Sequence, residues 1–210
     1  MNSKLESYIK MIELDFEKIY ESRKEILIQL KKYLLYKYRK RQKANLIFIC
    51  THNSRRSHFA HIWLATSISY YNLKNINTFS GGTSVTEFNK RAIAILKKIG
   101  YNINNQNENN PVYKVSFSKK ISPLKCFSKK YDSSFNPNKN FAAIMTCSDA
   151  EKTCPFILRA EERILLPYDD PKIFDGTNYE EEYYKKSCRK IATEMLFLMS
   201  EFQNSISFLK

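Results

Sequence analysis

The sequence is poor in residues that break helices. It has 4 glycines and 6 prolines in 210 residues, and neither type occurs in residues 1–44. No apolar run approaches the roughly 20 residues of a membrane span, and the N-terminus, which is rich in Glu and Lys, does not resemble a secretory signal peptide. We therefore expect no membrane span, a cytoplasmic protein, and a long helical segment at the N-terminus.

Apolar residues in this segment recur at spacings of three and four, which is the pattern of an amphipathic helix. Residues 1–44 are therefore predicted to form one or two helices that extend the main domain. The apolar stripe could dock on that domain or pair with a second copy in a homodimer, and both alternatives remain open. The stripe consists of Leu5, Ile9, Ile12, Phe16, Ile19, Ile26, Leu30 and Tyr33, and Arg23 interrupts it.

The net charge of +14 is unevenly distributed, because residues 1–44 and 112–140 together supply +12 of it. Lys37, Arg39, Lys40, Arg41 and Lys43 form a dense basic cluster that nucleic acid or an acidic membrane surface could bind. No nucleic-acid fold signature accompanies the cluster. We therefore predict a solvated basic face and no nucleic-acid partner.

The most informative stretch is a short apolar run, residues 46–49, that ends at Cys50. A loop of this length can turn its backbone N–H groups inward, and the following helix adds its positive end, so the pair can hold a tetrahedral anion. Cys50 is the candidate nucleophile, Arg56 can bind two oxyanion oxygens, and the Ser57 hydroxyl can bond the sulfur. The candidate anion-binding residues are Thr51, His52, Asn53, Ser54, Arg55 and Ser57.

Strands and helices alternate from residue 45 onward, which predicts an α/β domain with a parallel, doubly wound sheet over residues 45–210. Helices are expected at 56–73, 88–99 and 179–208, and a strand at 75–80. Residues 102–140 show a weaker pattern and are interpreted as an atypical insertion near the rim of the site. The closing helix is expected to bury Tyr183, Ile191, Met195, Leu198 and Phe202.

Two further polar segments follow apolar strands. One strand, residues 141–146, ends at Cys147, and Cys154 follows seven positions later. The other strand, residues 163–166, leads to Asp169, Asp170 and Pro171. Five cysteines in a chain of this kind indicate thiol chemistry rather than a structural disulfide framework. Cys126 and Cys188 are interpreted as incidental or packing thiols.

Residues 50–57 resemble the phosphate-binding loop of the low-molecular-weight protein tyrosine phosphatases and of the thioredoxin-coupled arsenate reductases that share their fold. The resemblance implies a four-stranded parallel sheet flanked by helices. The segment with Cys147 and Cys154 is similar to the redox segment of the reductases. Asp170 before Pro171 resembles the family's general acid, with Asp169 as the alternative.

The resemblance implies reduction of arsenate to arsenite. Cys50 attacks the bound arsenate, Cys147 displaces arsenite to form a disulfide, and Cys154 moves that disulfide to where an external reductant such as thioredoxin can reach it. No cofactor is implied. The alternative is hydrolysis of phosphate monoesters, on small molecules or phosphoproteins, which needs only Cys50, Arg56 and Asp170. A third reading is a non-catalytic binder.

Three positions depart from the family pattern. His52 stands where relatives carry glycine, so its backbone must adopt the required conformation with a side chain attached. Arg55 replaces a second cysteine of many relatives. The reductases bind potassium through a glutamate on the first helix, and this chain has His61 there, although Asn53 and Ser80 match. We therefore predict no metal ligand.

Overall fold

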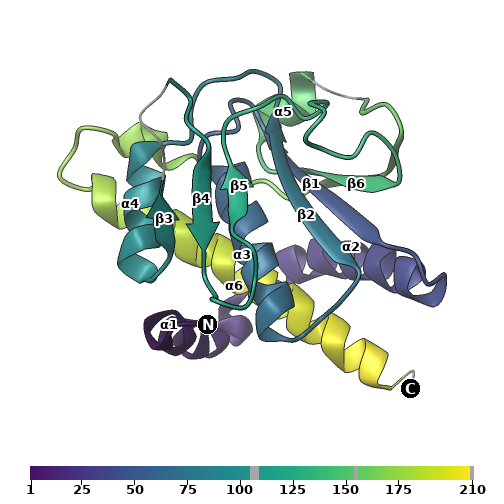
Figure 1. Ribbon diagram of the computed structural model, residues 1–210. Coiled ribbons are helices and arrows are strands. Elements are labelled where there is room, and N and C mark those ends of the chain that lie inside the picture. Colours follow the sequence, from purple (N-terminus) through teal and green to yellow (C-terminus); the bar gives the residue numbers. More distant parts are fainter. Residues whose placement is uncertain (105–108, 154–155, 209–210) are drawn as a thin grey trace.

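A computed structural model describes residues 1–104, 109–153 and 156–208 (Figure 1). A parallel sheet is formed by β1 (Ala44–Cys50), β2 (Ile76–Gly82), β6 (Phe141–Met145) and β7 (Ala160–Leu165), in the order β2-β1-β6-β7. The α/β class and the four-stranded parallel sheet are confirmed.

The two faces of this sheet belong to different apolar clusters, because alternate side chains of a strand point to opposite sides. Leu46 and Phe48 of β1 join the main core with α3 (Arg56–Tyr70) and α6 (Glu180–Ser207). Ile47 and Ile49 join a smaller cluster that includes Ala150 of α5 (Ser148–Thr153). Cys50 belongs to this smaller cluster.

Helix α3 follows β1 directly and contacts α6, β1 and β2. Helix α4 (Lys90–Ile99) begins after Asn89, whose side chain accepts the N–H groups of Arg91 and Ala92 as an N-cap. The apolar residues Ala92, Ile95, Leu96 and Ile99, which recur with helical spacing in the sequence, are buried.

In α6 the buried stripe differs by one residue from the prediction. Tyr184 is fully buried, whereas Tyr183 is only partly buried and stacks on Phe174, with ring centroids 3.3 Å apart. The reason is the helical phase, since residue 184 is in step with the later buried positions. These are Cys188, Ile191, Met195, Leu198 and Phe202.

The N-terminal segment forms two helices, α1 (Ser3–Glu13) and α2 (Glu21–Arg39), separated by the short helix η1 (Phe16–Lys18). Both helices contact α6, and their apolar residues Leu5, Ile9 and Leu30 are fully buried in the main core. Of the two arrangements expected for this stripe, docking is observed, and the homodimer stays a prediction. Within the described residues, none of the helices combines the length and the apolar character that crossing a bilayer requires.

Residues 102–140 contain a small antiparallel sheet that the sequence did not predict. It consists of β3 (Asn102–Asn104), β4 (Tyr113–Ser116) and β5 (Leu124–Cys126). Only its middle strand falls within a segment that alternates like a strand in the sequence, residues 112–117. Figure 1 shows this sheet beside α4, on the same side of the molecule as β2.

Candidate active site

Cys50 lies at the end of β1, and the chain turns through residues 51–55 into the first turn of α3. Its sulfur is 3.1 Å from the Ser57 hydroxyl oxygen, which also accepts a hydrogen bond of 2.9 Å from the Asn53 side-chain amide. Cys50 is 3% exposed and Ser57 is fully buried. The thiol is therefore held at the N-terminus of a helix by a hydroxyl that has its own partner.

The strained backbone of this loop lies at Asn53 and not at His52. Asn53 has a φ of 45°, in the left-handed region that asparagine tolerates better than most residues. The expectation that His52 would carry the special conformation was wrong, because the left-handed residue falls one position later. The His52 side chain is exposed, and its carbonyl accepts hydrogen bonds from Ser128 and Thr86.

Gly82, the last residue of β2, lies directly against the loop. A Cβ atom there would be 2.7 Å from the Asn53 nitrogen and 2.8 Å from the Thr51 carbonyl oxygen. Real side chains do not approach backbone atoms so closely, so only glycine fits without a shift of the loop. In the described part of the chain, N–H groups 51–54 make no hydrogen bond to a backbone carbonyl. They are therefore available to an anion.

Residues that follow β5 hold the loop from the side. The backbone N–H of Lys129 donates to the Asn53 side-chain oxygen at 3.0 Å, and the carbonyl of Lys129 accepts from the Gly82 N–H at 2.8 Å. The Tyr131 N–H in turn donates to the Gly82 carbonyl at 2.9 Å. This part of the insertion therefore lies at the site, as expected, although the sequence did not identify these contacts.

Arg56 is fixed by the segment that follows β7. One terminal nitrogen donates to the Tyr168 carbonyl at 3.0 Å, and the other donates to an Asp170 carboxylate oxygen at 2.7 Å. Its Nε is buried and has no hydrogen-bond partner in the described part of the chain. An unpaired buried donor on a guanidinium is costly unless a ligand completes it. The free Nε is thus a suitable donor for an oxyanion.

Asp170 faces the loop, whereas Asp169 is exposed to solvent. Asp170 also caps the short helix η2 (Pro171–Phe174), because its carboxylate accepts the Lys172 N–H at 3.1 Å. The second arginine, Arg55, lies 3.7 Å from the same carboxylate. Of the two candidate acids, Asp170 is therefore the one within reach of the oxyanion loop.

Arg55 is anchored by a residue that the sequence reasoning missed. Its Nε donates to the Tyr184 hydroxyl at 2.9 Å, and that hydroxyl donates to Asp175 at 2.9 Å. Burial raises the pKa of Tyr184 to about 12, so the hydroxyl stays protonated and can serve as both acceptor and donor. The apolar periodicity of α6 could have identified Tyr184 as a buried residue. The prediction chose Tyr183, one position earlier, and so missed it.

Cys147 follows β6 and lies next to the loop. Its sulfur is 3.5 Å from the Thr51 hydroxyl and accepts the Ala150 N–H at 3.4 Å, and the residue is 1% exposed. Cys50 and Cys147 belong to the same apolar cluster. Cys154 lies outside the described residues. The remaining thiols, Cys126 and Cys188, are buried in the main core, where burial raises the pKa of each to about 12.

The residues at the potassium position of the reductases do not fit that ion. His61 is buried, and its pKa is lowered to about 3 by burial and by the nearby charge of Lys129, so it is uncharged at neutral pH. Both ends of the Asn53 amide are occupied by protein partners. Lys129, whose pKa burial lowers to about 8, adds a positive charge where a cation site would need a negative one.

A buried cysteine at the end of a strand, followed by a helix whose first arginine pairs with a carboxylate, is typical of enzymes with a cysteine nucleophile and an oxyanion-binding loop. No protein-family model matches the chain. The arsenate reductase of Staphylococcus aureus strain Newman is 26% identical over 129 residues, which are 61% of this chain and 79% of the relative. Arsenate reductase 2 of Staphylococcus epidermidis is 25% identical over the same length.

Solved structures show the same fold. A low-molecular-weight phosphotyrosine phosphatase of Vibrio cholerae O395 matches with a TM-score of 0.53 and 16% identity, covering 77% of this chain and 97% of that protein. An arginine phosphatase of Geobacillus stearothermophilus matches with a TM-score of 0.54 and 15% identity, covering 79% and 97%. In sequence the chain is similar to arsenate reductases, and it shares the fold of low-molecular-weight phosphotyrosine phosphatases.

Proposed function

We propose that this protein reduces arsenate to arsenite with thiols. The observation that carries the proposal is the second buried cysteine, Cys147, which contacts Thr51 of the oxyanion loop and shares an apolar cluster with Cys50. Hydrolysis has no use for a thiol at this place. The curated relatives named above are arsenate reductases, which supports the same reading.

In the proposed reaction the Cys50 thiolate attacks arsenic in a bound arsenate, and one arsenate oxygen leaves as water after protonation by Asp170. The Cys147 thiolate then attacks the Cys50 sulfur. The S–As bond breaks, its electron pair stays with arsenic, and arsenite leaves. Arsenic has gained two electrons, and the two thiols have lost two in forming one disulfide.

Recovery of the enzyme requires thiol–disulfide exchange. The Cys154 thiolate attacks the Cys147 sulfur, which frees the Cys50 thiolate and leaves a Cys147–Cys154 disulfide. An external dithiol such as thioredoxin then reduces that disulfide, so no bound cofactor is needed. We place this cycle in the cytoplasm, where thiols are kept reduced.

The test is arsenite release from arsenate in the presence of thioredoxin and its reductase, for the parent protein, for Cys147→Ser and for Cys126→Ala. We expect Cys147→Ser to lose arsenite production by at least about a hundredfold, because the disulfide cannot form. Cys126→Ala is the matched control, since it removes a buried thiol of the main core that does not belong to the cluster of Cys50 and Cys147. Equal arsenite production by Cys147→Ser and the parent would refute the relay.

The second candidate function is hydrolysis of phosphate monoesters through a phosphocysteine. The pairing of Arg56 with Asp170 favours it, because an arginine for the anion and an acid for the leaving oxygen are what hydrolysis needs. The same assay plate follows hydrolysis of an aryl phosphate. Hydrolysis that survives in Cys147→Ser, with no arsenite from either protein, identifies a phosphatase. Loss of both activities in Cys50→Ser separates either enzyme from a non-catalytic binder.

A further inference from the structure

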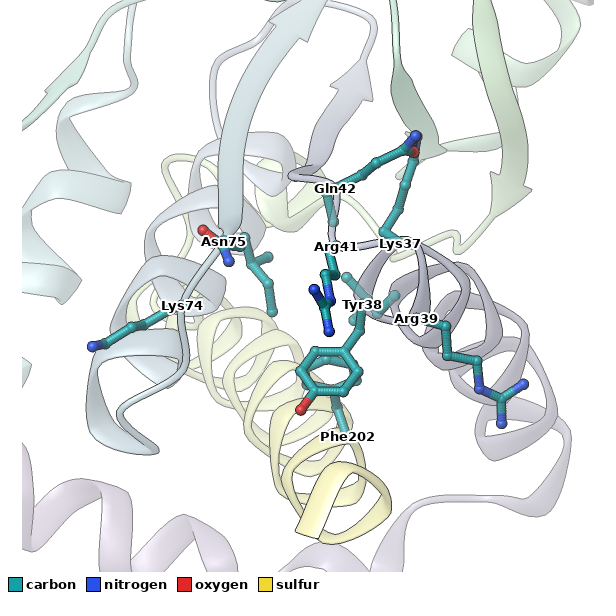
Figure 2. A pocket seen from close by; sticks show the side chains of 11 residues that line it. Lys37, Tyr38, Arg39, Arg41, Gln42, Lys74, Asn75 and Phe202 are labelled. Atoms are coloured by element: carbon teal, nitrogen blue, oxygen red, sulfur yellow. Dashed lines mark hydrogen bonds between the residues drawn. The ribbon is translucent and has the colours of Figure 1, made fainter. Parts of the chain in front are cut away.

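A cavity lies at the opposite end of the parallel sheet from Cys50, and Figure 2 shows the residues that line it. It has a volume of about 580 Å³, which is within the usual range for small-molecule sites. Its lining includes Ala44 and Ile76, which are the first residues of β1 and β2. Cys50 and Gly82 are the last residues of the same two strands. At about 3.3 Å per residue the two sites are roughly 20 Å apart. We call this site the α2 cavity.

The charged side chains that line the α2 cavity are all basic: Lys37, Arg39, Arg41 and Lys74. Lys37 is already neutralised, since its ammonium lies 2.5 Å from Glu161 and 3.3 Å from the Gln42 side chain. Figure 2 shows the Arg41 guanidinium extending into the cavity, while the side chains of Arg39 and Lys74 point away. Among the described residues, Arg41 makes no hydrogen bond or ion pair through its side chain.

The backbone of Arg41 adopts the left-handed conformation, which is unfavourable for a residue with a long side chain. Its φ is 54°, and it closes α2 with two hydrogen bonds, from the Arg41 N–H to the Tyr38 carbonyl and from the Gln42 N–H to the Lys37 carbonyl. This turn normally carries glycine or asparagine at the left-handed position. A long charged residue in a strained conformation is a mark of functional sites. The turn therefore fixes the Arg41 backbone at the edge of the cavity.

The remaining lining combines apolar and aromatic residues with the polar side chains of Gln42 and Asn75. The Tyr38 ring packs edge-to-face on Phe202, with ring centroids 6.1 Å apart and planes at 87°. Tyr38 is 38% exposed, so its ring offers free surface. Leu34, Ala44 and Phe202 are buried beneath it. A ligand that is complementary to both the basic and the apolar parts of the lining would therefore need an apolar body as well as a negative charge.

We propose that the α2 cavity binds a small anionic molecule that carries an aromatic or aliphatic body. The Arg41 guanidinium binds the phosphate, sulfonate or carboxylate of the ligand, because its planar fork donates two parallel hydrogen bonds to such a group. The exposed Tyr38 ring, which rests on Phe202, packs against the body. This site is separate from the oxyanion loop, so the inference does not depend on the proposed reaction.

Anilinonaphthalene sulfonate is a suitable probe, because it combines an anion with an aromatic body and fluoresces when its rings are bound. Titrations would compare the parent with Arg41→Gln and with Arg39→Gln, the matched control whose side chain points out of the cavity. We expect Arg41→Gln to weaken dye binding by about tenfold, the effect of one lost charge-assisted contact. Arg39→Gln should change it by less than about twofold.

Arg41→Gly is a second variant that excludes misfolding as the cause of lost dye binding, because glycine readily adopts a φ of 54°. It should show the same loss of dye binding and unchanged aryl phosphate hydrolysis. Arg56→Gln removes an anion-binding side chain of the Cys50 loop and should leave dye binding unchanged. The inference is overturned if Arg56→Gln weakens dye binding as much as Arg41→Gln does, if Arg41→Gln binds as the parent does, or if the protein sediments with phosphatidylglycerol vesicles but binds no dye.

Discussion

Gly82 determines how closely the second strand approaches the oxyanion loop. Gly82→Ala would place a Cβ 2.7 Å from the Asn53 nitrogen, so the loop must shift. We expect a loss of about a hundredfold in kcat/KM, since displacements of about 1 Å have that effect on positioned groups. Steady-state hydrolysis of an aryl phosphate measures it.

Gly176→Ala is the control for this substitution. Gly176 has a positive φ of 77°, and a Cβ there would meet nothing within 4 Å. That variant should lose about 1 kcal/mol of stability from backbone strain and keep its activity. Full activity in Gly82→Ala would show that the loop tolerates the shift.

The buried histidines should make the fold sensitive to acid. His61 has a folded pKa lowered to about 3, by burial first and then by Lys129, whereas the unfolded value is near 6.5. Below pH 6.5 the unfolded chain therefore binds a proton that the folded chain does not. The free energy of unfolding falls by up to about 1.4 kcal/mol per pH unit from this residue alone.

Urea unfolding of the parent, His61→Gln and His52→Gln at pH 7, 6 and 5 tests this. The pH slope should flatten in His61→Gln and stay unchanged in His52→Gln, because His52 is exposed. The comparison uses the change in unfolding free energy with pH rather than the unfolding free energy itself, so a pH-independent packing cost of the substitution cancels. Identical slopes in all three proteins would mean that His61 can be protonated inside the fold.

Much of the candidate site follows from local sequence, because Cys50, Arg56 and Ser57 lie within one loop and its helix. The contacts that join distant segments do not. Tyr168 and Asp170 meet Arg56 across more than a hundred residues, and Tyr184 reaches Arg55 from α6. Periodicity identifies buried faces, but it does not state which loop a face will meet.

Helix α2 supports the segment that carries Asp170 through Arg23, the residue that interrupts its apolar stripe. Arg23 donates to the Pro167 carbonyl and to both carboxylate oxygens of Glu194, and Glu194 also accepts the Tyr168 hydroxyl. The Arg23 and Glu194 side chains are 13% and 3% exposed. Arg23→Met would leave a buried carboxylate without its cation, which costs about 3 kcal/mol or more.

Chemical denaturation of Arg23→Met, Glu194→Gln and the double variant measures this coupling. We expect the double variant to be more stable than the sum of the single losses predicts, because the second change removes the unpaired charge. Strict additivity would show that the two side chains act independently. Reduced kcat in Arg23→Met at unchanged KM would further link α2 to the position of Asp170.

The small sheet of β3, β4 and β5 shows where pattern reading fails at this level. Two of its strands are three residues long, and the segment around them is rich in Asn and Lys. A three-residue strand is too short to show an alternation, so pairing with β4 decides its conformation. The parallel sheet was predictable because β1 and β6 are continuous apolar runs, as expected of strands buried on both faces.

The N-terminal extension is part of the core of the whole molecule. Leu5, Ile9, Ile12, Leu27, Leu30 and Leu34 are at most 1% exposed and share one cluster with α6 and the sheet. Burying six such side chains contributes on the order of 10 kcal/mol, which is comparable to the total stability of a domain. The apolar stripe of α1 and α2 is thereby occupied within the chain.

A fragment of residues 44–210 should therefore fail to fold cooperatively, because the face of α6 that α1 and α2 cover would be exposed to water. Near-ultraviolet circular dichroism and a thermal melt decide this. Two point variants test the same packing in the full chain. Leu30→Ala should lower the free energy of unfolding by about 2 to 5 kcal/mol. Leu14→Ala, at a residue that is 78% exposed, should lower it by less than about 0.5 kcal/mol. A fragment that melts cooperatively near the full chain's Tm and still hydrolyses an aryl phosphate would show that the extension is a separate appendage. In that case the stripe on α1 and α2 would again be free to pair with a second copy.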